Sequence, residues 1–305
     1  MTTPIITFFG VPKPFKGSIG VIQRNAIQSW CALKPLADVV LLGNESGCSQ
    51  TAKDLGIRQI KNIEVNEYGT PLVSAIFRTA EAETSSNLIC YLNSDIMLTR
   101  DFLSAINVVS SKWDRFLLVG RRRDIDLNVP WDFTQPDSEI KLLKYVNKKS
   151  ELHSVWGIDY FVFPRGLWGE IPPFALGRPS YDNWLIYKAR ALGVPVIDAT
   201  ETITAIHQNH DYGHFKGGKQ TFLEGPETKR NIALAGGQKY FFSLADSTWF
   251  LTSDGLKRYS NLTYLRKWLY RLPALSPRLS LLITPLLHMI RRPKNAAKQA
   301  NRNKF

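Results

Sequence analysis

The chain has 305 residues, with 39 Lys and Arg against 26 Asp and Glu, and a formal net charge of +13. A hydrophobic fraction of 44%, with 11% aromatic residues, is enough for a packed core and excludes a mainly disordered chain. So basic a chain fits nucleic acid, an anionic membrane surface or a phosphorylated ligand as partner. Residues 255–305 hold twelve basic residues and no Asp or Glu, which leaves residues 1–254 with 27 basic and 26 acidic residues. The basic excess therefore lies in the tail.

Cysteine usage and apolar run lengths indicate the compartment. The three cysteines, Cys31, Cys48 and Cys90, are odd in number and form no Cys-x-x-Cys pair, which predicts a reducing compartment without a disulfide framework. The N-terminus lacks the pattern of a signal peptide. The longest apolar stretch, near Leu279–Ile290, is broken by Pro285 and is shorter than the about 20 residues that span a bilayer. We expect no transmembrane helix and a cytoplasmic protein.

Strand-like apolar runs alternate with segments of helical spacing through the first 120 residues. The expected strands are Pro4–Phe9, Val39–Leu42, Gln59–Ile63, Leu88–Leu92 and Phe116–Val119. The expected helices are Ile19–Leu33, Ser49–Leu55, Pro71–Glu83 and Phe102–Ser110. This order predicts an α/β fold with a mostly parallel sheet and helices on both of its faces. Ligands of such sheets bind at the carboxyl ends of the strands.

The pattern changes after Gly120. Residues 121–150 are polar and irregular apart from one helical patch, Ser138–Val146, and we expect a long excursion or lid. The strands expected beyond it are Gly157–Pro164, Val194–Ile197 and Ile203–Ile206, with a helix over Tyr181–Leu192. A dinucleotide-binding Gly-x-Gly-x-x-Gly and a P-loop are both absent, which argues against a dehydrogenase and an NTPase.

The first candidate site is Asn93-Ser94-Asp95, directly after the expected strand Leu88–Leu92. A carboxylate at the carboxyl end of a buried parallel strand points into the ligand crevice. Asp95 is therefore a candidate ligand for a divalent cation that bridges a diphosphate. The structural alternative is an Asx turn, because Asn, Ser and Asp are also favourable turn residues.

The second candidate site is a histidine cluster, His207, His210 and His214, just after the expected strand Ile203–Ile206. Imidazole is a common metal ligand, but the spacing does not match a zinc finger. A polar loop with hydrogen-bonded histidines is the alternative. If both groups lie at strand ends, the cluster becomes the second half of a metal site with Asp95.

Two further carboxylates and a run of arginines are candidates. Asp182, at the start of an expected helix, fits either a helix N-cap or a general base that faces the crevice. Asp159 interrupts an apolar strand, so it either pairs with a base such as Arg165 or holds a polar ligand. The run Arg121–Arg123 fits phosphate binding or a solvated charged surface.

Taken in order, these signals resemble the GT-A glycosyltransferases, in particular bacterial family 2-like glycosyltransferases, over roughly residues 3–220. The similar stretches are Phe9–Phe15, Asn66–Val73, Tyr91–Ile96, Gly157–Arg165, Asp182–Trp184 and Ile197–His214. The resemblance implies a nucleotide-binding half over residues 1–120 and an acceptor and catalytic half over 121–250. The composition of the rest predicts a basic, amphipathic helical tail over 251–305. It also implies a UDP- or GDP-sugar donor and a divalent cation, Mn²⁺ or Mg²⁺.

The resemblance also implies roles for single residues. Asp95 and His207 take the positions of metal ligands, with His210 and His214 competing with His207. Asn93 stands where the family usually has a first Asp, which leaves one charged contact fewer. Asp182 takes the position of the catalytic base, and Asp159 lies near the acceptor or the donor sugar. The implied nucleotide contacts are Phe9, Gly10, Val11, Pro12, Tyr68, Gly69, Thr70, Asn93, Ser94 and Arg121.

The implied activity is inverting, metal-dependent transfer of a hexosyl or pentosyl group to a hydroxyl of a saccharide or lipid-linked acceptor. Envelope polysaccharide or glycolipid synthesis is the expected setting. Two alternatives stay open: a nucleotidyltransferase, whose Gly-rich basic loop is not evident in residues 10–17, and a non-catalytic protein that binds sugar nucleotides or glycans on the same fold.

The basic tail determines where we expect the protein to lie. Tyr264, Leu265, Trp268, Leu269 and Leu272 form an apolar stripe at helical spacing, and Pro273 and Pro277 are expected to break that helix. The apolar stretch near Leu279–Ile290 follows, and residues 295–305 are expected to be disordered. This pattern predicts peripheral contact with an anionic membrane, at the inner face of the cytoplasmic membrane. Packing on the body or a homo-oligomer is the alternative, and we expect no nucleic-acid binding.

Overall fold

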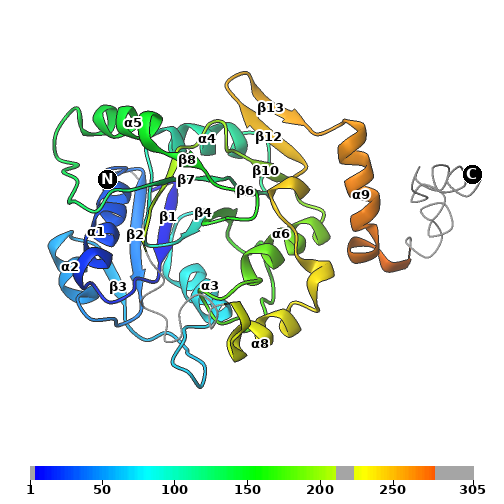
Figure 1. The fold of residues 1–305 in the computed structure, drawn as a ribbon, viewed down its shortest axis with the longest axis horizontal. Helices are drawn as coiled ribbons and strands as arrows, with labels where there is room; N and C mark the ends of the chain where they lie inside the picture. The colour runs from blue at the N-terminus through cyan, green and yellow to red at the C-terminus, as the bar shows by residue number, and fades with distance from the viewer. Residues whose placement is uncertain (1–3, 211–222, 279–305) are drawn as a thin grey trace, which may run out of the picture. The chain divides into compact units, whose positions relative to one another are not determined.

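The structure is a computed structural model that describes residues 4–210 and 223–278. The chain divides into two units, Met1–Tyr259 and Ser260–Phe305. The first unit has a mostly parallel central sheet flanked by helices (Figure 1). This architecture confirms the predicted α/β fold class. The roles assigned to residues 1–120 and 121–250 stay predictions.

A nine-stranded sheet runs through the first unit in the order β13-β12-β10-β6-β9-β4-β1-β2-β3. All strands are parallel except β9, which lies antiparallel between β4 and β6, and the edge strand β13. The central strands are apolar because both of their faces are covered, as in parallel sheets generally. The strands are β1 (Ile6–Gly10), β2 (Ala37–Leu42), β3 (Arg58–Ile60), β4 (Leu88–Leu92), β6 (Leu117–Val119), β9 (Tyr160–Pro164), β10 (Val196–Asp198), β12 (Trp249–Thr252) and β13 (Gly255–Arg258).

Successive aromatic residues of β1 show how helices cover both faces of this sheet. Side chains alternate between faces along a strand. The Phe8 ring lies 5.4 Å from that of Phe102 on one face, and the Phe9 ring lies 5.5 Å from that of Phe77 on the other. Among the described residues, the labelled α-helices of this unit are α1 (Gly17–Cys31), α2 (Cys48–Asp54), α3 (Val73–Glu83), α4 (Asp101–Ser110), α5 (Ser138–Lys149), α6 (Tyr181–Ala191) and α8 (Pro226–Leu234).

A second, four-stranded sheet has the order β5-β11-β7-β8. Its strands are β5 (Ile96–Met97), β7 (Arg122–Ile125), β8 (Glu151–Leu152) and β11 (Ala205–Gln208). The expectation that residues 121–150 lack regular structure outside one helix is wrong at β7. That strand carries Arg122, Arg123 and Asp124 and so has no apolar run, yet it pairs in parallel with β11. Pairing with β11, and not an apolar pattern of its own, therefore makes this segment a strand.

The second unit has one described helix, α9 (Leu262–Leu275). The Asn261 side chain caps it by accepting a hydrogen bond from the Tyr264 amide. Pro273, expected to break this helix, lies inside it, and the helix ends two residues later. Within the described residues, no helix is long and apolar enough to cross a membrane. The stretch near Leu279–Ile290 and residues 295–305 lie outside the described part of the chain.

Candidate functional site

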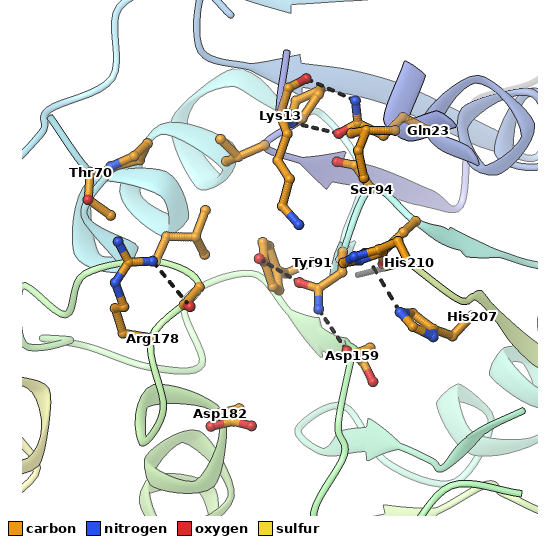
Figure 2. A pocket seen from close by; sticks show the side chains of 18 of the residues that line it. Lys13, Gln23, Thr70, Tyr91, Ser94, Asp159, Arg178, Asp182, His207 and His210 are labelled. Carbon is orange, nitrogen blue, oxygen red and sulfur yellow. Dashed lines mark hydrogen bonds and ion pairs between the residues drawn. The ribbon is translucent and has the colours of Figure 1, made fainter. Parts of the chain in front are cut away.

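A cavity of about 510 Å³ opens where β1 and β4 end. Its wall is built from the loops after these two strands, from β11 and from the start of α6. Figure 2 shows labelled side chains of these elements entering the cavity from several sides. The sequence-predicted site residues in its wall are Val11, Pro12, Gly69, Thr70, Asn93, Ser94, Asp95, Asp159, Asp182, His207 and His210.

Asp95, His207 and His210 form a cluster of side chains that could hold a metal ion. One ligand atom from each lies within 4.8 Å of the other two. The Asp95 Oδ2 atom is 3.2 Å from His210 Nε2 and 3.9 Å from His207 Nε2. The other oxygen, Oδ1, is buried and has no hydrogen-bond partner among the described residues. A buried carboxylate oxygen without a partner is costly unless it has a ligand, so the cluster fits a cation.

Local backbone structure brings these residues together. The chain turns after β4, and the Ile96 amide donates to the Asn93 carbonyl at 3.1 Å. Ile96 and Met97 then form β5, which pairs antiparallel with β11 so that Ile96 lies opposite His207. Asp95 is thereby placed beside β11. A turn is therefore present, but it is closed by backbone groups and is not the predicted Asx turn, because the Asn93 side chain bonds Tyr91 and Asp159 instead. The turn positions the Asp95 carboxylate beside β11.

The charges of the cluster keep Asp95 ionised. Burial by itself raises the pKa of Asp95, but the hydrogen bond with His210 and the nearby charges of His207 and Lys13 outweigh it. The net effect holds the pKa of Asp95 well below its ordinary value. One carboxylate and two imidazoles form a mixed oxygen and nitrogen donor set. Such a set suits Mn²⁺ or another first-row divalent ion better than Mg²⁺, which prefers oxygen ligands.

Asp124 on β7 contacts His207 at Nδ1, the ring nitrogen other than the one that lies near Asp95. Its Oδ1 atom lies 3.0 Å from His207 Nδ1, which is within ion-pair distance but does not form a hydrogen bond, while its Oδ2 atom lies 2.6 Å from His153 Nδ1 and forms a hydrogen bond there. A carboxylate at Nδ1 favours the tautomer with the proton there, which leaves the Nε2 lone pair for a metal. Burial raises the pKa of Asp124, but its contacts with His207, Arg122 and His153 lower it overall, so it is ionised. Sequence reasoning did not find Asp124, because only the β7–β11 register places it opposite His207.

We expect Asp124→Asn to weaken Mn²⁺ binding by about 10-fold or more. The amide cannot stabilise the Nδ1–H tautomer of His207 as a carboxylate does. Titration of Mn²⁺ into the nucleotide-free protein, followed by electron paramagnetic resonance, measures this affinity. Asp114→Asn, an exposed acidic residue, is the matched control. Equal Mn²⁺ affinity in the Asp124 variant and the wild type would show that Asp124 does not support the cluster.

Asp159 is buried in a chain of polar contacts. Arg122 Nη1 donates to both of its carboxylate oxygens at 2.9 Å. Asn93 Nδ2 donates to its Oδ1 at 2.7 Å, and Tyr91 donates its hydroxyl to Asn93 Oδ1 at 3.0 Å. The base that pairs with Asp159 is thus Arg122 on β7 and not Arg165, which instead donates to the Ser86 carbonyl at 3.4 Å. Asn93 uses its amide to support Asp159, so it has a role that an aspartate could not fill.

Asp182 lies in the first turn of α6. The N-cap position belongs to Ser180, so the interpretation of Asp182 as the N-cap is wrong. The Oδ1 atom of Asp182 is buried and has no hydrogen-bond partner within the described residues. Burial is the main cause that raises the pKa of Asp182 to about 7; backbone amides, first that of Asn183, oppose the shift, and the charge of Asp159 adds to it. A carboxyl group with such a pKa exchanges a proton readily near neutral pH.

Four residues predicted to contact a nucleotide do not line this cavity. Phe9 is fully buried in the aromatic layer with Phe77 and Tyr91. Gly10 is buried, and a Cβ atom there would lie 3.0 Å from the Leu92 carbonyl oxygen. Tyr68 is 57% exposed, and Arg121 points its guanidinium at backbone carbonyls near His153. His214, the third histidine of the cluster, lies outside the described residues.

Several cavity residues were not among the sequence-predicted ones. Lys13 follows Pro12 in the loop after β1, and Arg178 comes from the loop before α6. Arg178 is held by Glu227 on α8, with its Nε and Nη2 atoms 2.9 and 2.6 Å from Glu227 Oε2. No periodicity marks a single basic residue in a loop. The position of Lys13 at the end of the first parallel strand is the signal that could have identified it.

Comparison with known proteins gives matches in structure only. No protein-family model matches the chain, and no curated protein sequence matches it. S. aureus TarS 1-349 in complex with UDP matches at 13% identity and a TM-score of 0.46, over 94% of this chain and 86% of that one. Glucosyl-3-phosphoglycerate synthase from Mycobacterium tuberculosis, in complex with Mn²⁺, UDP-glucose and phosphoglyceric acid, matches at 14% and 0.45, over 77% and 81%.

A mannosyltransferase from Pyrobaculum calidifontis in complex with GDP-Man and Mn²⁺ matches at 14% identity and a TM-score of 0.44. The match covers 70% of this chain and 59% of the mannosyltransferase. Matches at these identities and TM-scores describe a partial likeness in fold. The cavity and its residues therefore carry the functional assignment.

Proposed function

We propose that the protein is a glycosyltransferase that uses a divalent cation and a nucleoside-diphosphate sugar. In this proposal Asp95, His207 and His210 hold the cation, and Asp182 deprotonates an acceptor hydroxyl, which displaces the nucleoside diphosphate with inversion. The observation that carries the proposal is that one cavity joins a cluster of metal ligands to a buried carboxyl group whose pKa is about 7. This pairing suits a reaction in which the leaving diphosphate gains negative charge at the cation while the acceptor hydroxyl loses its proton to the carboxylate.

Asp182 has the properties of a general base. A base works best when its pKa lies near the operating pH, because it is then ionised and still basic enough to take a proton. Asp159 is engaged by Arg122 and Asn93, so we assign it a positioning role in place of direct chemistry. Its negative charge helps to raise the pKa of Asp182. Arg122 in turn holds the Asp159 carboxylate in place through an ion pair at 2.9 Å.

The proposed metal ligands act on the leaving group by holding the cation beside it. A bound Mn²⁺ or Mg²⁺ ion supplies charge neutralisation for the departing diphosphate, a contribution on the order of several kcal/mol. Asp95 contributes its ionised carboxylate, and His207 its Nε2 atom with the ring held by Asp124. The loop residues Val11, Pro12, Gly69 and Thr70 line the same cavity and are proposed to contact the nucleoside.

A panel of sugar nucleotides tests the proposal. UDP-glucose, UDP-N-acetylglucosamine and GDP-mannose are each incubated with the protein, once with Mn²⁺ and once with EDTA, and the products are identified by mass. We expect slow, Mn²⁺-dependent release of nucleoside diphosphate from at least one donor, even without an acceptor. In a parallel reaction supplied with a sugar 1-phosphate and a nucleoside triphosphate, release of pyrophosphate would indicate a nucleotidyltransferase instead. Donor binding without turnover, in the presence of candidate glycan acceptors, would indicate a binding protein.

The rate should rise with pH through the pKa of Asp182. Because that pKa is raised from 3.8 to about 7, the carboxyl group is protonated and inactive as a base in mildly acidic solution. We expect kcat/KM to fall about tenfold per pH unit below about pH 7 and to level off above it. Rates are measured from about pH 5.5 to about 9, with Mn²⁺ affinity measured in parallel to separate loss of the cation from loss of the base. A profile that is flat from about pH 6 upward, with Mn²⁺ bound throughout, would count against Asp182 as the base.

We further propose that the basic tail attaches the protein to an anionic membrane surface. Residues 255–305 carry twelve basic residues and no acidic one, and α9 interleaves Arg266, Lys267 and Arg271 with apolar side chains. Cosedimentation with phosphatidylglycerol vesicles should be strong at low salt and weak at high salt. Equal recovery with purely zwitterionic vesicles would contradict an electrostatic attachment, and no recovery with either kind of vesicle would leave packing or oligomerisation as the role of the tail.

A further inference from the structure

Lys13 extends into the cavity from the loop between β1 and α1. This loop follows the carboxyl end of a central parallel strand, where ligands of such sheets bind. Figure 2 shows the Lys13 side chain directed into the cavity, with Asp182 on the opposite side of the view. Lys13 therefore faces the cavity from the side away from the proposed base.

The backbone of Lys13 is held in place. Gln23 on α1 is only 2% exposed and makes two hydrogen bonds to it. The Lys13 amide donates to Gln23 Oε1 at 2.6 Å, and Gln23 Nε2 donates to the Lys13 carbonyl at 2.9 Å. Pro12 and Pro14 flank the residue, and each fixes its own φ angle. Because the buried Gln23 amide bonds to both backbone groups of Lys13, the direction in which the Lys13 side chain leaves the loop is fixed.

The ammonium of Lys13 differs from the other cations of the wall. Arg122 is paired with Asp159 and Asp124, and Arg178 with Glu227. Within residues 4–210 and 223–278, the Lys13 Nζ atom has no hydrogen bond and no ion pair. Burial lowers the pKa of Lys13, and the charge of Asp95 opposes this shift. A partly desolvated cation without a contacting carboxylate is a favourable place for an anionic ligand.

We infer that Lys13 binds the diphosphate group of the donor, as a second positive charge beside the cation cluster. The inference rests on the proposed function and names the group that this cavity recognises. The ammonium is a compact point charge that suits phosphate oxygens. Figure 2 shows the end of the Lys13 side chain and His210 in the upper part of the view, with Asp182 below them, so Lys13 lies toward the cation cluster. An acceptor would instead meet Asp182 at the other side.

Calorimetry with the full chain in Mn²⁺ tests this inference. The ligands are UDP, UMP and uridine, and in parallel GDP, GMP and guanosine, because the proposed contact of Lys13 is with the diphosphate and not with the base. For the diphosphate that binds the wild type, Lys13→Gln should lower the affinity by about 10- to 100-fold. The affinity for the matching nucleoside should change by less than about 2-fold, and Lys13→Arg should restore much of the loss. Lys16→Gln, an exposed lysine of the same loop, is the control and should behave as the wild type.

The outcomes separate this inference from the proposed function. If the wild type binds a nucleoside diphosphate but Lys13→Gln binds it equally well, the inference is overturned and the proposed function stands. If Lys13→Gln weakens nucleoside and diphosphate alike, Lys13 acts through the shape of the loop, which also overturns it. If the wild type binds neither diphosphate with Mn²⁺, the proposed function and this inference both fail.

Discussion

Asp182→Asn should lower kcat by about 10²- to 10⁴-fold, the usual loss when a general base is removed. The amide keeps the size of the side chain but cannot accept the proton of an acceptor hydroxyl. Nucleotide affinity in Mn²⁺ should stay within about 3-fold of the wild type, because the proposed donor contacts lie elsewhere in the cavity. Single-turnover rates with a saturating donor measure the effect directly. A variant that retains near-normal turnover would show that another group takes the proton.

The stability of Asp182→Asn provides its control. The pKa of Asp182 is raised on folding from 3.8 to about 7, so the folded protein binds more protons than the unfolded chain between these values. Stability therefore falls as the pH rises through this window, and the ionised carboxylate costs stability above it. We expect the free energy of unfolding of Asp182→Asn at about pH 8 to equal or exceed that of the wild type. A lower value would indicate that loss of activity reflects misfolding.

Asp95→Ala should weaken Mn²⁺ binding by about 100-fold or more and abolish metal-dependent donor turnover. This variant removes the only carboxylate of the cluster in the described part of the chain and leaves two imidazoles. Removing a residue that only orients a metal ligand already lowers metal affinity by about 10- to 100-fold, so loss of a charged ligand should cost at least as much. Electron paramagnetic resonance of Mn²⁺ added to the nucleotide-free protein measures the affinity.

Asp95→Asn and a panel of metals refine this test. The amide retains one oxygen ligand without the charge, so its Mn²⁺ affinity should lie between those of the wild type and Asp95→Ala. Two histidines and a carboxylate also form the donor set of non-haem iron oxygenases. Turnover of a sugar nucleotide supported by Mn²⁺, Mg²⁺ or Co²⁺ fits the proposed function. Strict dependence on Fe²⁺ and oxygen, or an unchanged Mn²⁺ affinity in Asp95→Ala, would contradict it.

The apolar core of the fold could be predicted from the sequence, because its strands are continuous apolar runs. Leu88–Leu92 was expected as a strand and forms β4 with the same bounds. The helix expected over Pro71–Glu83 begins two residues later, as α3, at Val73. In contrast, β7 was missed because Arg122, Arg123 and Asp124 give no apolar alternation. Polar strands are stabilised by their pairing partners, which a single sequence does not reveal.

The candidate site could be predicted in part for the same reason. Asp95 and Asp182 were found because each follows a strong local signal, a strand end or a helix start. Asp124 and Lys13 were missed, since their roles depend on which distant residues lie beside them. Asp124 meets His207 only through the register of β7 with β11, and Lys13 is fixed by Gln23 on the next helix. A role that depends on contacts between residues distant in the chain cannot be recognised from the local sequence.

The central claim is that one cavity binds a divalent cation and a nucleoside diphosphate together. Isothermal titration of the wild type with UDP and with GDP, in Mn²⁺ and in EDTA, tests it most directly. We predict that at least one of the two binds about 10-fold or more tightly with Mn²⁺, and that it raises the affinity for Mn²⁺ by the same factor, as linkage requires. Equal affinity in Mn²⁺ and EDTA, or no binding of either nucleotide, would contradict the claim.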